Sequence, residues 1–133
     1  MSNDNNLMGV YIDVLRDTWD AEKQIVAAMP SVIEAASSDQ LKNALAEHLE
    51  ETKNHVTVVE RVIRKHNEDP QGEKCNGMEG LLKESKKTIS EFEKGPARDS
   101  LLIANCQKVE HYEISAYGKL CTYAAQLGFE DDD

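Results

Sequence analysis

Ionisable side chains interrupt the apolar stripe of the segment HLEETKNH, which lies within a long amphipathic run. On a helix, the inward face of this segment would carry His48, Glu51 and His55, because residues three and four apart share a face. A carboxylate buried without a partner is costly, so a cluster of them usually holds a metal ion or protons. Either these residues lie on the surface, or the core holds something that needs them.

Three other amphipathic runs carry carboxylates on their inward stripes. They are Glu22 in the first run, Glu79 in the third, and Glu110 and Glu113 in the fourth. Glutamates that converge with a histidine from four helices suit a hard or borderline divalent ion. Iron or manganese fits best, and zinc is a possible substitute. Two ions bridged by carboxylates would disperse more negative charge than one, so we expect a dinuclear site, with an asymmetric site or one that has lost one metal as the alternatives.

The elements that position these residues follow from the periodicity of the apolar side chains. Four runs with three- and four-residue steps predict four helices, separated near Ser38, at the loop HNEDPQGE and at Gly95-Pro96. The sequence shows no strand-like alternation. The predicted class is all-α, an antiparallel four-helix bundle over residues 1–128, followed by an acidic tail (129–133) that we expect to be disordered.

Counting from the turns brings the polar residues to common levels. Glu22 and position 54 are equally far from the turn at Ser38, on opposite sides of it. Glu79 and position 112 are likewise equally far from the turn at Gly95-Pro96. Positions equidistant from the turn of an antiparallel hairpin face each other. To bring both hairpins to one level, residues 67–75 would form a crossover, with the third helix parallel to the second as in ferritin-like bundles.

Charge and composition exclude several classes of partner. The net charge is −10 and no basic stripe is present, which argues against nucleic acid and anionic membranes. The N-terminus does not resemble a signal peptide, and no segment reaches the ~20 apolar residues of a membrane span. The three cysteines lack metal-finger spacing. A reduced, cytoplasmic setting is the natural interpretation.

Each carboxylate also has a simpler interpretation when it is taken alone. Glu51 and Glu110 could form weak surface ion pairs with nearby lysines. Glu79 lies near the start of a helix, where the helix dipole stabilises a carboxylate. Cys106, one turn before Glu110, could be a small core residue. The common register of the set is what favours a metal site.

Several segments resemble the YciE/YciF family of ferritin-like proteins: LRDTWDAEKQIVAAMP, EHLEETKNHV, KCNGMEGLL and QKVEHYEISAYG. The resemblance runs from Leu15 to Gly128. It implies a dimeric, cytoplasmic bacterial bundle linked to stress responses, with a dinuclear metal site. The implied ligands are Glu22, Glu51, His55, Glu79, Glu110 and Glu113, with His48 and His111 as second choices.

This chain departs from the family pattern in two places. Members of the family usually continue past the position of Gly128 into another helix, and they usually carry charged or larger residues at Asn76 and Gly77. The first departure puts the oligomer contact in doubt more than the metal site.

Two classes of function follow. The first is a non-haem di-iron or di-manganese protein that acts on oxygen or peroxide, with no substrate that can be named. The second is a non-enzymatic stress or scaffold protein with a structural or vestigial metal site, which acts through the surface of a homodimer.

Overall fold

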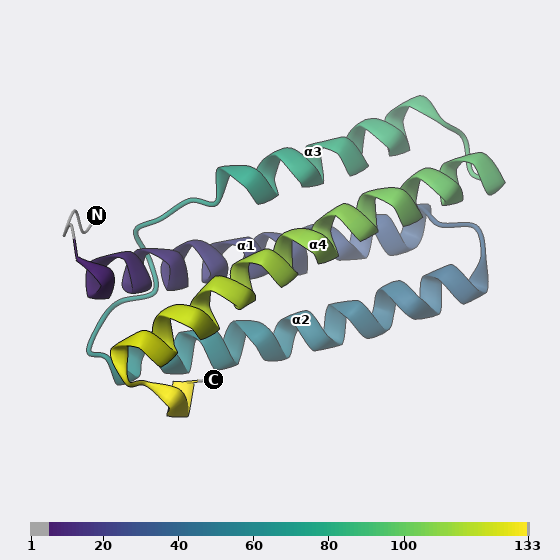
Figure 1. Cartoon of the computed structure of the whole chain (residues 1–133). Coiled ribbons are helices and arrows are strands. Elements are labelled where there is room, and N and C mark those ends of the chain that lie inside the picture. Colours follow the sequence, from purple (N-terminus) through teal and green to yellow (C-terminus); the bar gives the residue numbers. More distant parts are fainter. Residues whose placement is uncertain (1–5, 133) are drawn as a thin grey trace.

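In the computed structural model, which describes residues 6–132, helices α1 (Leu7–Ala35) and α2 (Asp39–Lys65) form a long antiparallel hairpin (Figure 1). The side chain of Asn6 accepts a hydrogen bond from Gly9 N and caps α1. The sequence offers Ser38 or Asp39 as the cap of α2, and Ser38 is the one that caps it, by accepting from Leu41 N. The hairpin register is also confirmed, because Glu22 meets His55, next to the expected position 54.

The second hairpin has arms of unequal length, α3 (Asn76–Glu91) and α4 (Pro96–Leu127). Helix α3 begins halfway along α1, where Cys75 N donates to Asp20 Oδ2 (2.7 Å) and Gln24 Nε2 donates to the carbonyl of Cys75 (3.0 Å). It ends beside the C-terminus of α1, where Arg98 donates to the carbonyls of Ala35 and Ile89. Helix α3 therefore covers only one half of the bundle, against α1 and α4.

The crossover is present, but the predicted direction of the third helix is wrong. Helices α2 and α4 run in the same direction, and α3 runs antiparallel to α2 (Figure 1). Residues 66–75 return the chain only to the middle of α1, and the 16 residues of α3 complete the return. Helix α3 is thus part of the crossover, and α4 is the helix that lies parallel to α2.

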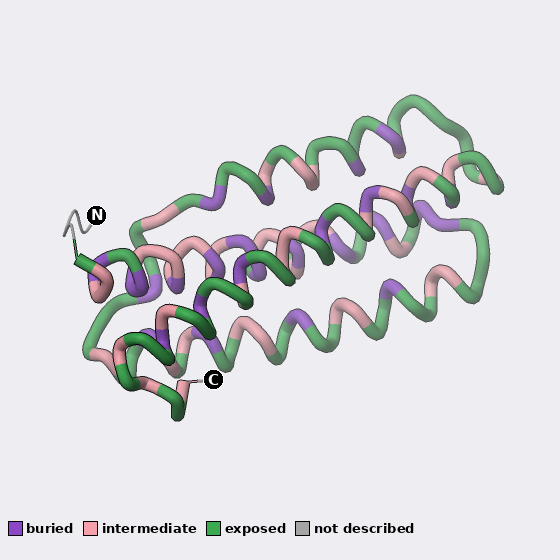
Figure 2. The backbone as a smooth tube through the Cα atoms, in the orientation of Figure 1, coloured by how far each residue is buried: buried purple, intermediate pink, exposed green. Residues whose placement is uncertain are grey.

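Two apolar clusters fill the two halves of the bundle. One gathers around Ile25, Met29 and Leu102, and the other around Tyr11 and Ile63. Buried positions face inward from all four helices (Figure 2). Between the clusters lies a layer of polar residues: Thr18, Glu22, His48, Thr52, His55, Glu113 and Tyr117. The fold thus places polar groups where the two apolar clusters meet.

The acidic tail is ordered as far as Asp132, which corrects the expectation of disorder. Residues Glu130–Asp132 form a turn of 3-10 helix, η1. The side chain of Asp132 is 1% exposed and accepts hydrogen bonds from Tyr11 Oη (2.7 Å), His66 Nε2 (2.7 Å) and Lys65 Nζ. Three donors from α1 and the end of α2 therefore hold this carboxylate. The expectation for Asp133 lies outside the described residues.

Within residues 6–132, no helix has a stretch long and apolar enough to cross a membrane.

Asp99 ties the two hairpin turns together. Its side chain is buried, Oδ1 accepts from Ser37 N (2.8 Å) and Oδ2 accepts from Ser38 N (2.9 Å). One carboxylate in the first turn of α4 thereby satisfies two backbone donors at the start of α2.

We predict that Asp99→Ala lowers the free energy of unfolding by about 2–3 kcal/mol, because it leaves backbone donors without their charged acceptor. Equilibrium unfolding in urea measures this loss. Glu93→Ala, an exposed acidic residue before the same turn, is the matched control and should change stability by less than about 0.5 kcal/mol. Equal effects of the two substitutions would contradict the role of Asp99.

Candidate metal centre

Glu22 lies at the centre of the polar layer, with 1% of the residue exposed. Its Oε2 accepts a hydrogen bond from His55 Nδ1 of α2 (2.9 Å) and another from Tyr117 Oη of α4 (3.2 Å). Its Oε1 is buried and receives no hydrogen bond. A carboxylate in water has both oxygens solvated, so an ionised Glu22 would lack part of the stabilisation that its charge needs here.

Glu113 of α4 brings a second carboxyl group to the same place. Donor atoms of Glu22, His55 and Glu113 all lie within 4.8 Å of one another. His48 of α2 lies on the other side of Glu113, with Nε2 at 3.2 Å from Oε1. Helices α1, α2 and α4 thus each contribute to one group of carboxyl and imidazole side chains.

Burial and neighbouring charges shift the ionisation of this group. Burial raises the pKa of Glu22 to about 9, and the adjacent carboxyl of Glu113 adds to the shift. Burial also raises the pKa of Glu113, but hydrogen bonds with His48 and Glu22 outweigh it, so the net shift is downward. Hydrogen bonds with Cys106 and Glu113 raise the pKa of His48 to about 10. In metal-free protein these shifts favour one proton shared by the two carboxyl groups, held on the Glu22 side.

The structure brings most of the predicted ligands together. Glu22, His55 and Glu113 form the central group, and Glu110 belongs to an adjacent one with His48 and Cys106. Glu51 is exposed and lines a cavity of about 430 Å³ that also borders His48, His55, Glu110 and Glu113. Glu51 and Glu110 therefore lie at the open side of the centre.

Glu79 is not placed with the other predicted ligands. It lies on α3, where it forms ion pairs with Lys74 and Lys83 (3.6 Å). The predicted height of Glu79 along the bundle, opposite position 112, is nearly right, because Cys75 Sγ at the start of α3 lies 3.0 Å from Tyr112 Oη. However, α3 packs on the side of α1 and α4 away from the centre. His111 is exposed and belongs to neither group of donor atoms. Helix α3 is part of the crossover, and this is why its carboxylate is not at the centre.

His48, which the sequence places on the inward stripe and the resemblance gives only as a second-choice ligand, and Tyr117, which is outside the implied ligand set, both contact the centre. The fully buried residue of this part of α2 is Thr52, whose hydroxyl donates to the carbonyl of His48 (2.7 Å). Leu45, Thr52 and Val59 recur at seven-residue steps and define the inward stripe. His48 and His55 flank that stripe on one side, toward α4. The three-residue pattern leaves either Glu51 or Thr52 on the inward stripe, and the seven-residue spacing is the signal that favours Thr52 inside and Glu51 at the rim.

The donor set fits a divalent cation of the iron or manganese type. Carboxylate oxygens and imidazole nitrogens are ligands of these ions. The buried Oε1 of Glu22, which receives no hydrogen bond, offers a lone pair to such an ion. The other ring nitrogen of His55 and the exposed carboxylates of Glu51 and Glu110 could complete the coordination from the cavity of about 430 Å³ that they border.

We predict that the metal-free protein becomes less stable as the pH rises from about 6 to 9. The pKa of Glu22 is raised from 4.5 to about 9 in the folded state, so its stabilising contribution is complete below pH 4.5 and is lost as the pH rises toward 9. The free energy of unfolding should fall by on the order of 1 kcal/mol per pH unit. His48, whose pKa is raised to about 10, adds a loss of the same sign.

Unfolding in urea at a series of pH values, with chelator present, measures this slope. Glu22→Gln removes the titrating group and should make the slope shallower, while the part due to His48 stays. Glu79→Gln changes the same chemical group outside the centre and should leave the slope unchanged. If the slope of Glu22→Gln equals that of the wild type, the proton is not held by Glu22.

Known proteins resemble this chain in both sequence and structure. Residues 6–133 match a family described as a domain of unknown function, DUF892. Protein YciF of Escherichia coli (strain K12) is 41% identical over 128 residues, which cover 96% of this chain and 77% of YciF.

Two solved structures share the fold. YciF, described as a stress protein of E. coli, superposes with a TM-score of 0.91 and 40% identity, over 97% of this chain and 82% of that one. YcfI of Rhodopseudomonas palustris, to which a structural role is provisionally attributed, gives a TM-score of 0.93 and 37% identity, over 99% and 85%. Together with the motifs QKVEHYEISAYG and EHLEETKNHV, these similarities show that the chain belongs to the DUF892 family of YciF-like proteins.

Proposed function

We propose that this protein is a ferritin-like metal-binding protein whose centre holds iron or manganese and serves a response to stress. Glu22, His55 and Glu113 would hold the first ion. A second ion would lie toward the cavity of about 430 Å³, where Glu51 and Glu110 are exposed. The link to stress rests on the relative YciF, which is described as a stress protein.

The observation that carries the proposal is the buried Glu22 carboxyl with an oxygen that receives no hydrogen bond. Glu113, another carboxyl, is its neighbour within 4.8 Å. Two acids in one buried site can avoid repulsion by sharing a proton or by binding a cation. A divalent ion would neutralise both and would take up the lone pairs that no donor satisfies.

Access from solvent favours chemistry on a small oxidant. The cavity of about 430 Å³ borders His48, His55 and Glu113, so small molecules can reach the centre from the surface. A bound redox metal would supply the electrons for oxygen or peroxide chemistry. Neighbouring hydroxyl groups would hold the ligands in place. Tyr117 Oη donates to Glu22, and the hydroxyl of Thr52 donates to the backbone carbonyl of His48.

A second candidate is a structural centre in a non-enzymatic protein. Its support is that the polar layer ties α1, α2 and α4 together through Glu22, His55 and Tyr117. Such a protein would act through its surface. Ile103 (45% exposed) and Ile114 (68% exposed) of α4 are apolar residues that a homodimer could bury.

We predict that protein purified without added metal or chelator contains iron or manganese, or binds Mn²⁺ after dialysis. Glu22→Gln and Glu113→Gln should each weaken Mn²⁺ binding by at least about 10- to 100-fold, since that is the loss typical of even outer partners of a metal site. Elemental analysis and equilibrium dialysis measure content and affinity, and circular dichroism verifies helicity.

Glu79→Gln is the matched control, because it makes the same change on α3. It should leave Mn²⁺ binding unchanged. Stoichiometric metal in the wild type, together with peroxide or ferrous turnover, supports the redox function. Stoichiometric metal without turnover supports the structural candidate. Absence of binding by the wild type, even with ferrous ion under anaerobic conditions, would overturn the redox function and leave the second candidate, acting through its surface with a metal-free polar layer.

A further inference from the structure

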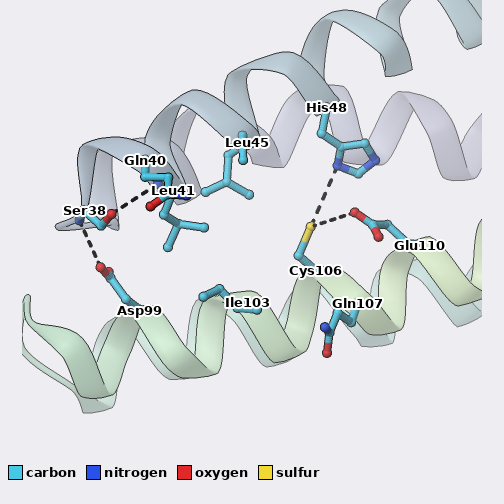
Figure 3. A pocket seen from close by; sticks show the side chains of 11 residues that line it. Ser38, Gln40, Leu41, Leu45, His48, Asp99, Ile103, Cys106, Gln107 and Glu110 are labelled. Carbon is cyan, nitrogen blue, oxygen red and sulfur yellow. Dashed lines mark hydrogen bonds between the residues drawn. The ribbon is translucent and has the colours of Figure 1, made fainter.

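A second group of donor atoms lies between α2 and α4, next to the central one. It consists of a ring nitrogen of His48, Cys106 Sγ and a carboxylate oxygen of Glu110, all within 4.8 Å of one another (Figure 3). Cys106 and Glu110 are four residues apart on α4 and therefore share a face. His48 approaches from α2 on the opposite side. Sulfur, nitrogen and oxygen thus converge from two helices.

The separations of these atoms match a tetrahedral metal site. Zinc binds sulfur at about 2.3 Å and imidazole nitrogen or carboxylate oxygen at about 2.0–2.2 Å, so tetrahedral angles put the sulfur about 3.6 Å from either of the other ligand atoms. Cys106 Sγ lies 3.6 Å from Glu110 Oε1 and 4.0 Å from His48 Nδ1. Small side-chain rotations are sufficient to reach the bonded geometry.

Glu113 orients His48 for this task. A metal ion that binds His48 displaces the Nδ1 proton, while Nε2 keeps its hydrogen toward Glu113 Oε1 at 3.2 Å, so the lone pair is then on Nδ1, the nitrogen that faces Cys106. A carboxylate that holds the far nitrogen of a ligating histidine is a recurrent feature of zinc sites. The central group therefore supplies the outer partner of the second one.

The space beside this group leaves room for a further ligand. A cavity of about 510 Å³ borders His48, Cys106 and Glu110 and continues along Leu41, Leu45 and other residues toward Asp99. Its walls between α2 and α4 include Leu41, Leu45 and Ile103 (Figure 3). A three-ligand site with an open fourth position is typical of zinc that binds water or a small molecule.

We propose that His48, Cys106 and Glu110 form a thiolate-containing site for a borderline divalent ion of the zinc type, distinct in chemistry from the carboxylate centre at Glu22. The thiolate selects zinc over manganese, because soft sulfur ligands favour softer ions. The inference rests on the proposed function, which places a second ion near Glu110, and it adds that this second ion is of the zinc type. The centre would then hold two unlike ions, with Glu113 between them.

The test uses Co²⁺, which replaces zinc and reports a thiolate ligand by a near-ultraviolet charge-transfer band. Titration of the reduced full chain with Co²⁺ should produce this band to saturation near one equivalent, and Zn²⁺ should abolish it. Cys106→Ser should lose the band and weaken Zn²⁺ binding at this position by more than about 10-fold. Cys121→Ser, the matched control on the same helix, should keep both.

Glu22→Gln separates the two positions. It should keep the thiolate band while it loses Mn²⁺ binding. If the band stays in Glu22→Gln but the wild type binds no Mn²⁺ or Fe²⁺, the proposed redox centre fails and the zinc-type site stands. Absence of the band in the folded wild type, or an unchanged band in Cys106→Ser, would overturn the inference. Loss of the band in a helical Glu22→Gln variant would show that the two positions are not separate.

Discussion

One buried carboxyl group, Glu22, is the main constraint on this structure, because it lies where two apolar clusters meet and its charge has no place there without a proton or a cation. Its neighbours match it: His55 and Tyr117 donate to one oxygen, and Glu113 lies close enough to compete for the same proton or cation. In water this carboxyl would ionise at an ordinary pH, but burial raises its pKa to about 9. Without metal, the folded chain bears the free-energy cost of keeping this carboxyl group protonated or of burying its charge. A bound cation would compensate the charge and so stabilise the folded state.

The arrangement of the helices follows from the need to surround this group. Helices α1, α2 and α4 bring one or more polar side chains to the layer, while α3 covers α1 and α4 on the other side. The parallel course of α2 and α4 requires the chain to return between them, and residues 66–75 together with α3 make that return. Cys75 fixes its midpoint through hydrogen bonds to Asp20 and Gln24. The side of the layer between α2 and α4 stays open, and two of the cavities that border His48 lie there.

Much of this could be predicted from the sequence, because helix periodicity and turn residues are local signals. The four helices, the cap at Ser38 and the pairing of Glu22 with His55 all follow from them. The direction of α3 could not be predicted in this way. It depends on where the loop after α2 ends, and the contacts of that loop with α1 set this position, which the loop sequence does not reveal. For the same reason the predicted position of Glu79 at the centre is not found. Its height along the bundle is nearly as predicted, but its side chain lies on another side of α3, with Lys74 and Lys83. The order of Asp132 is likewise a long-range effect, because its partners Tyr11 and His66 are distant from it in the sequence.

The most direct test of the central role of Glu22 compares the unfolding free energies of wild type and Glu22→Gln at pH 7.5, each with chelator and with saturating Mn²⁺. We expect opposite orders of stability in the two conditions. With chelator, Glu22→Gln should be the more stable protein, because glutamine needs no proton and keeps the hydrogen-bonding shape. With Mn²⁺, the wild type should gain stability and Glu22→Gln should gain none. A Glu22→Gln variant that is less stable than the wild type with chelator, or that Mn²⁺ stabilises equally, would contradict this role.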